Sequence, residues 1–113
     1  MLLRNASNGT VLATNVARAT DAWSRGIGLL GHKSVAPAEG LWIDGCSAVH
    51  TVFMRATIDI FFLDKDQRVL KIASSVAPYR LAVTCRNAVS VVELGATGDT
   101  VRDVLVGDRL ALE

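Results

Sequence analysis

Cysteine, aromatic residues and long apolar runs are all scarce in this sequence, and each shortage excludes a class of protein. The two cysteines, Cys46 and Cys85, form no C-x-x-C pair, which excludes a disulfide framework and favours buried free thiols over a zinc or thioredoxin-like site. No segment approaches the roughly 18 apolar residues of a membrane span, so we expect none. Residues 1–5 lack the basic start and the apolar core of a secretory signal, which predicts a soluble, cytoplasmic protein.

An excess of charge of one sign is also missing. Twelve Lys and Arg against 11 Asp and Glu give a net charge of +1 without a basic run, and aromatic residues make up 5% of the chain. Because a nucleic-acid binder needs a basic surface, we expect no nucleic-acid partner. The sequence also lacks a phosphate loop, since Gly26-Ile27-Gly28 supplies only two glycines and no Gly-Lys-Ser/Thr occurs.

The overall amino-acid composition is that of a globular protein. Half of the 113 residues are hydrophobic and 20% are charged, far from the low hydrophobicity and high charge of a disordered chain. The length suits one hydrophobic core and is too short for two. We therefore expect a single compact domain over residues 1–113.

Short strands separated by turn residues dominate the predicted secondary structure. Asn8-Gly9 is a preferred hairpin pair between residues 1–4 and 10–16, and the polar turn over residues 64–67 joins a second pair of strands at 58–63 and 68–73. Further strands are predicted at residues 41–43, 49–54, 81–84, 88–94 and 109–112. One short helix is expected between residue 20 and Gly31, and a helical turn follows Asp99 or Thr100.

This pattern predicts a mainly β fold, either a β-sandwich or a small barrel, of about seven or eight short strands with one or two short helices. An α+β fold is the alternative. A doubly wound parallel sheet is disfavoured, because it would need several crossover helices and the chain offers one short helix.

Residues 46–64 join the densest apolar block to the most reactive side chains. Cys46, His50 and Met54 follow one another at four-residue spacing, which in a helix would place three copper or zinc ligands on one face. The β-branched residues between them indicate a strand instead, in which each interval spans about 13 Å. Cys46, His50 and Met54 would then lie too far apart to share a metal, and Cys46 would lie too far from His50 to form a catalytic pair. We therefore predict no metal, no other cofactor and no catalytic residue.

Two carboxylates lie inside apolar strands. Asp59 stands within the run at residues 58–63, and Glu93 stands within the run at 88–94. A buried charge requires a partner, and Arg55, Arg80 or a backbone amide could serve Asp59. We favour a structural ion pair or hydrogen bond for each carboxylate, with ligand binding or acid–base chemistry as the alternative.

Several ordered motifs resemble a known family. They are W-S-R-G-I-G-L-L-G at 23–31, the H-T-x-F-M-R and I-D-I-F-F-L-D segments within 46–64, P-Y-R at 78–80, V-E-L at 92–94 and G-D at 107–108. Together they resemble the domain of unknown function 192 family of prokaryotes. Thr57, Gly95 and Thr97 depart from the residues usual in that family. The resemblance implies a compact β-rich domain and no established activity, cofactor or substrate, and some similar proteins are exported.

The residues favour a small non-enzymatic ligand-binding or accessory domain with a pocket around His50, Arg55 and Asp59. Its partner would be a small molecule or a protein. The alternative is a small-molecule enzyme, a hydrolase or proton-transfer catalyst, that uses His50 and Asp59. The full set of candidate ligand-binding residues is His50, Met54, Arg55, Asp59, Arg25 and Glu93. The oligomeric state is left open.

Overall fold

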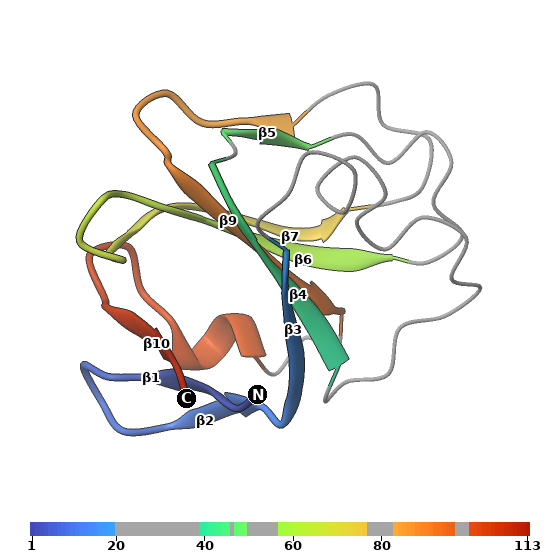
Figure 1. Ribbon diagram of the computed structural model, residues 1–113, viewed down its shortest axis with the longest axis vertical. Coiled ribbons are helices and arrows are strands. Elements are labelled where there is room, and N and C mark those ends of the chain that lie inside the picture. The colour runs from blue at the N-terminus through green and yellow to red at the C-terminus, as the bar shows by residue number, and fades with distance from the viewer. Residues whose placement is uncertain (20–38, 46, 50–56, 77–82, 97–99) are drawn as a thin grey trace.

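The computed structural model describes residues 1–19, 39–45, 47–49, 57–76, 83–96 and 100–113, and over these ranges the chain is mostly β (Figure 1). The described strands are β1 (Leu3–Asn5), β2 (Val11–Ala13), β3 (Asn15–Ala19), β4 (Glu39–Asp44), β5 (Ala48–Val49), β6 (Ile58–Leu63), β7 (Val69–Val76), β8 (Val83–Thr84), β9 (Ser90–Gly95) and β10 (Leu110–Leu112). A short 3-10 helix, η1 (Thr100–Asp103), precedes β10. The mainly β prediction and the helical turn after residue 99 are confirmed.

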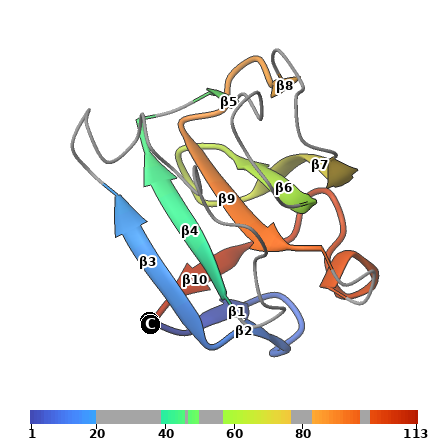
Figure 2. The ribbon, with the colours of Figure 1, turned by 90° about the vertical axis from the view of Figure 1, so that its right-hand side faces the viewer.

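The strands form one large sheet and two smaller ones. The large sheet has the order β3-β4-β9-β6-β7, and the three-stranded sheet has the order β10-β1-β2. Strands β5 and β8 form a two-stranded ladder of their own. The large sheet has β3 and β7 as its edges and is not closed into a barrel. Of the two predicted forms, a sandwich or a small barrel, the structure therefore has the layered, sandwich-like one (Figure 2).

Each face of the five-stranded sheet carries its own hydrophobic core. The first cluster packs between the large sheet and the three-stranded sheet and joins Leu3 and Leu110 to Phe61, Val92 and other buried residues. The second cluster lies on the opposite face and includes Ile43, Ile60 and Phe62, with the partly buried Cys85 packed against it. Because β6 and β9 are covered on both faces, all six residues of each strand are buried. The prediction of a doubly covered strand at 58–63 is confirmed.

Both predicted hairpins are confirmed. Gly9, with φ of 80°, lies in the connection between the antiparallel strands β1 and β2, where a positive φ favours glycine. The second hairpin joins β6 to β7 through residues 64–67. Its turn is fixed by the Asp64 carboxylate, whose Oδ1 accepts hydrogen bonds from the amides of Asp66 at 2.8 Å and Arg68 at 3.0 Å.

The prediction of one strand over residues 10–16 is wrong, because the chain bends at Thr14 and changes sheet there. Residues before the bend form β2 in the three-stranded sheet, and residues after it form β3 in the large sheet. Strand β3 pairs in parallel with β4, although every other described ladder is antiparallel. The predicted helix at 20–31 and most of the predicted strand at 49–54 lie outside the described residues.

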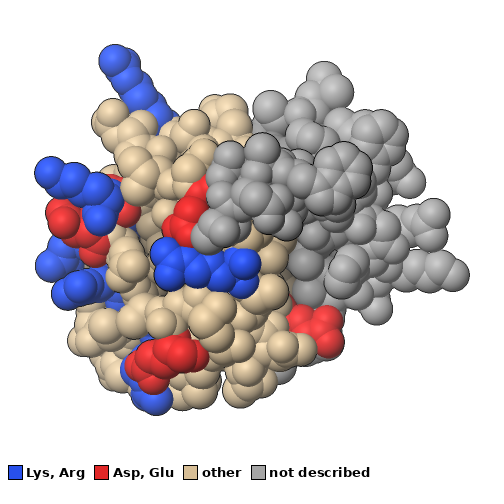
Figure 3. Space-filling model, in the orientation of Figure 1, with Lys and Arg blue, Asp and Glu red and all other residues tan. Residues whose placement is uncertain are grey.

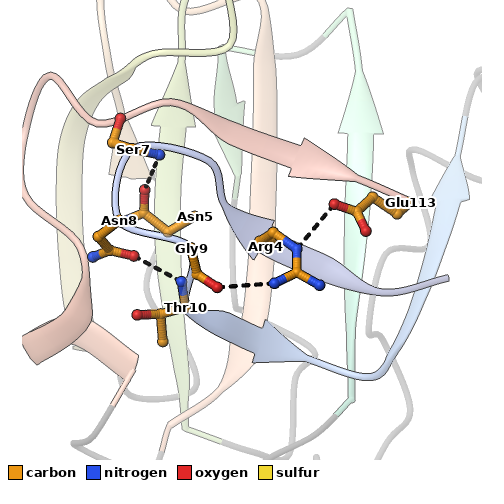
Figure 4. Close-up of polar contacts among 7 residues, drawn as sticks. All are labelled: Arg4, Asn5, Ser7, Asn8, Gly9, Thr10 and Glu113. Atoms are coloured by element: carbon orange, nitrogen blue, oxygen red, sulfur yellow. Dashed lines mark hydrogen bonds and ion pairs between the residues drawn. The ribbon is translucent and has the colours of Figure 1, made fainter.

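The two ends of the chain are bonded to each other. The amide of Leu2 donates to the carbonyl of Glu113, the amide of Glu113 donates to the carbonyl of Leu2, and Arg4 forms an ion pair with the Glu113 side chain (Figure 4). In the part of the chain that the structure describes, no helix has both the length and the apolar character to cross a membrane.

Candidate functional site

All five strands of the large sheet have a terminus at one end, which we name the Gly95 end. Strands β3, β4 and β6 begin there, and β7 and β9 finish there, because Asn15 pairs with Glu39, Gly40 pairs with Leu94, and Ile58 pairs with both Gly95 and Val76. Asp59 and Glu93 lie immediately inward of this end. The two described candidate residues therefore lie at the same end of the same sheet.

Asp59 and Glu93 nevertheless point to opposite faces. Asp59 is directly opposite Leu94, and Glu93 is directly opposite Ile60, across the antiparallel pair of β6 and β9. Opposite residues in such a pair share a face, and successive residues alternate. The clusters agree, since Leu94 belongs to the core beneath the three-stranded sheet and Ile60 belongs to the other core. One side of the sheet cannot present both carboxylates to one ligand.

Asp59 holds a β-bulge in place. Between the pairs Ile58–Val76 and Ile60–Ala73, β6 has one residue where β7 has two, Ser74 and Ser75. The Asp59 Oδ1 accepts a hydrogen bond of 2.8 Å from the amide of Ser75, whose φ is 52°. The partner is thus a backbone amide, one of the three that the sequence suggested.

The environment of Asp59 disfavours its charge. The side chain is fully buried, and its Oδ2 accepts no hydrogen bond from any residue that the structure describes. Burial raises the pKa of the Asp59 carboxyl above its usual value, and the hydrogen bond from Ser75 opposes that rise. Leu94, opposite Asp59, is tightly packed, because a Cβ added at Gly40 would collide with its side chain.

Glu93 lies on the other apolar face, two residues from Gly95. It is 3% exposed and lies directly opposite Leu41 on one side and Ile60 on the other. Both neighbours belong to the core on that face. A carboxylate in such surroundings has lost most of its hydration, so it requires a hydrogen-bond donor or a cation beside it.

The remaining candidates, His50, Met54, Arg55 and Arg25, lie outside the described residues, as does Cys46. The segment that carries His50, Met54 and Arg55 runs directly into Thr57, which precedes β6 at the Gly95 end. Among the described residues no group of three or more His, Cys, Asp or Glu side chains could hold a metal ion.

Sequence reasoning missed a polar cluster at the other end of β4. Asp44 accepts a hydrogen bond of 2.6 Å from Arg18 and one of 3.1 Å from the indole of Trp42. The bond from Arg18 is the largest of the contacts that lower the pKa of the Asp44 carboxyl. Asp44-Gly45 read as a turn in the sequence, and nothing there linked it to Arg18, which pairs with Trp42 across the parallel ladder.

A model of the DUF192 family, described as uncharacterised ACR, matches residues 3–112. The chain belongs to this family. The resemblance recognised in the ordered motifs is thereby confirmed. No curated protein matches the DUF192 chain described here.

Two solved structures share the fold. One, a suspected transcription regulator from Sinorhizobium meliloti 1021, has 26% sequence identity and a TM-score of 0.81, and the match covers 97% of this chain and 89% of the other. The second, a protein of unknown function from Novosphingobium aromaticivorans DSM 12444, has 19% identity and a TM-score of 0.78, with 98% and 82% coverage.

Proposed function

We propose that this DUF192 protein is a non-enzymatic ligand-binding or accessory domain whose site lies at the Gly95 end of the large sheet. Glu93 is its acidic group, and His50 and Arg55 are the polar residues that accompany it. The observation that carries the proposal is the burial of Glu93, at 3% exposure, within an apolar sheet face. Buried acidic groups in apolar surroundings are a frequent mark of ligand sites.

Asp59 has a supporting role in this proposal. Its Oδ1 is bonded to the bulge at Ser75, and its side chain is fully buried on the face that packs against the three-stranded sheet. A catalytic acid or base must reach the substrate proton. The burial of Asp59 therefore favours a binding domain over an enzyme that uses His50 and Asp59.

The S. meliloti relative is described as a suspected transcription regulator. If the present chain shares such a role, we propose that it acts by binding a small molecule or a protein. Direct contact with DNA is disfavoured because the net charge is only +1.

A thermal-shift screen of a metabolite and peptide library tests the proposal. A ligand present at 100 times its Kd stabilises the folded state by about 2.7 kcal/mol, which raises the melting temperature by roughly 10 °C. The shift should be lost in Glu93→Gln and in Arg55→Ala. Glu39→Gln is the matched control, because Glu39 lies at the same end of the sheet but is only partly buried.

Melting of each variant without ligand separates loss of folding from loss of binding, and His50→Ala provides a third substitution at the proposed site. Stabilising compounds that act equally on the wild type and on all three site variants would overturn the proposal.

A further inference from the structure

A cationic depression lies at the end of β6 away from the Gly95 end. It has a volume of about 460 Å³, and its lining is mostly polar. The residues that line it are Lys65, Asp66, Gln67, Arg68 and Arg109. Figure 3 shows Lys and Arg side chains gathered at the left-hand edge of the molecule, where the β6–β7 turn and the loop before β10 lie in Figure 1.

The backbone that carries these side chains is fixed. Arg68 and Arg109 face each other in an isolated antiparallel bridge. The amide of Arg68 donates to the Asp64 carboxylate, and the amide of Arg109 donates to the Ser7 hydroxyl at 2.9 Å. The Arg68 guanidinium also donates to the carbonyl of Gly107 at 3.0 Å. A ligand would meet one guanidinium group, that of Arg68, already positioned by the fold, and a second on the fixed backbone of Arg109.

Within the described ranges, the nearby carboxylates Asp64 and Asp108 form no ion pair with these cations. Asp64 accepts from two backbone amides of its own turn, and Asp108 accepts from the Asn5 side chain and the Leu105 amide. Across the described ranges, Lys65 and Arg109 make no side-chain hydrogen bond or ion pair. Three cationic side chains and Asp66 leave the lining with a net charge of +2.

We propose that this depression binds a phosphate group. A phosphomonoester carries a charge of about −1.5 to −2 at neutral pH, which complements the lining. Arginine guanidinium groups recognise phosphate oxygens through paired hydrogen bonds, and Lys65 adds a mobile point charge. The site is separate from the one proposed at the Gly95 end, since the two lie at opposite ends of β6.

The phosphate group can belong to a soluble molecule or to a lipid headgroup. Leu105 and Val106 are 69% and 65% exposed, and they immediately precede Gly107, whose carbonyl is bonded to Arg68. An exposed apolar pair beside a phosphate site suits insertion between lipid headgroups. Substitution of Leu105 and Val106 therefore offers a way to distinguish a lipid headgroup from a soluble phosphate compound.

Calorimetric titration of the full chain with inorganic phosphate and with pyrophosphate tests the site. Arg109→Gln is the first variant, because its side chain holds no structural bond among the described residues. Loss of one charged bidentate contact should weaken binding roughly ten- to a hundredfold. Arg86→Gln removes the same charge from an exposed loop outside the depression, and it should change the affinity by less than about twofold.

Vesicle sedimentation distinguishes the sources. Vesicles that contain phosphatidic acid, a phosphomonoester, are compared with vesicles of equal charge that contain phosphatidylglycerol. If the natural source is a lipid, the phosphatidic acid vesicles should bind more tightly, and a Leu105→Ser/Val106→Ser double variant should lose vesicle binding while keeping pyrophosphate binding. Pyrophosphate binding without preference for phosphatidic acid indicates a soluble phosphate.

Two results would overturn the proposal. One is the absence of saturable binding of both soluble probes to the folded wild type. The other is binding that Arg109→Gln leaves unchanged, with the fold of the variant confirmed by its melting temperature.

Discussion

Two buried polar residues, Asn5 and Asp59, lie in different sheets and differ in how completely they are bonded. Asn5 donates to the carbonyl of Asp103 at 2.8 Å and to the carboxylate of Asp108 at 2.9 Å, and its oxygen accepts from the amide of Ser7. Asp59 has one bond, from Ser75, and its second oxygen has no partner in the described part of the chain.

Asn5 therefore joins two parts of the fold, whereas Asp59 is a buried carboxylate with a single hydrogen bond from the described residues. The bonds of Asn5 tie the N-terminal hairpin, part of which Figure 4 shows, to the loop that leads into β10, and each buried polar atom there is satisfied. Asp59 buries a carboxylate at a cost and fixes a bulge at the end of the sheet where the proposed site lies. Bulges and incompletely satisfied groups are concentrated near functional sites.

Asn5→Ala should produce the largest change in stability. It removes three hydrogen bonds: the carboxylate of Asp108 and the amide of Ser7 lose their side-chain partner, and the carbonyl of Asp103 keeps only its side-chain bond from Asn8. We expect a loss of about 3 kcal/mol in the free energy of unfolding, measured by urea denaturation. Asn8→Ala is the control, since Asn8 also bonds the carbonyl of Asp103 but is exposed, and it should cost about 1 kcal/mol. Equal losses in the two variants would contradict the role of Asn5.

The sequence predicts the fold where local chemistry decides it. Asn8-Gly9 and the polar turn after β6 identify both hairpins, and the uninterrupted apolar run at 58–63 identifies a strand covered on both faces. The bend at Thr14 was not predictable, because residues 10–16 contain no Gly or Pro to mark it and the change of sheet depends on tertiary packing.

The candidate site was predictable only in part. A carboxylate inside an apolar run identifies Asp59 and Glu93 as unusual, and the structure confirms that both are buried. Their opposite faces depend on the register between β6 and β9, which no single strand encodes. The cationic depression was missed because Arg109 is distant in sequence from Lys65 and Arg68, and charged residues are ordinary in a turn.

Substitution of Asp59 should have a smaller effect that depends on the replacement. Asp59→Ala deprives the amide of Ser75 of its acceptor and should reduce the free energy of unfolding by about 1–2 kcal/mol. Asp59→Asn keeps an oxygen for that amide and removes the buried charge, so at neutral pH it should be at least as stable as the wild type. Chemical denaturation of both variants and of the wild type measures these differences in the free energy of unfolding. A large loss in Asp59→Asn would mean that the ionised carboxylate has a partner outside the described residues.

The smallest expected effect concerns how stability changes with pH: the contributions of Asp59 and Asp108 to the free energy of unfolding should change in opposite directions. The pKa of Asp59 is raised in the folded state by burial, so its contribution to stability is complete below the usual value of 3.8 and falls as the pH rises through the folded pKa. The pKa of Asp108 is lowered, chiefly by the hydrogen bond from Asn5, so its contribution is present above 3.8 and is lost as the pH falls through the folded pKa.

Urea denaturation of the wild type, Asp59→Asn and Asp108→Asn over a pH series measures both slopes. As the pH rises, the wild type should lose stability relative to Asp59→Asn and gain it relative to Asp108→Asn. If the wild type gained stability relative to both variants as the pH rises, Asp59 would be a fully bonded carboxylate like Asp108. The contrast between Asn5 and Asp59 would then no longer support a functional site at the Gly95 end.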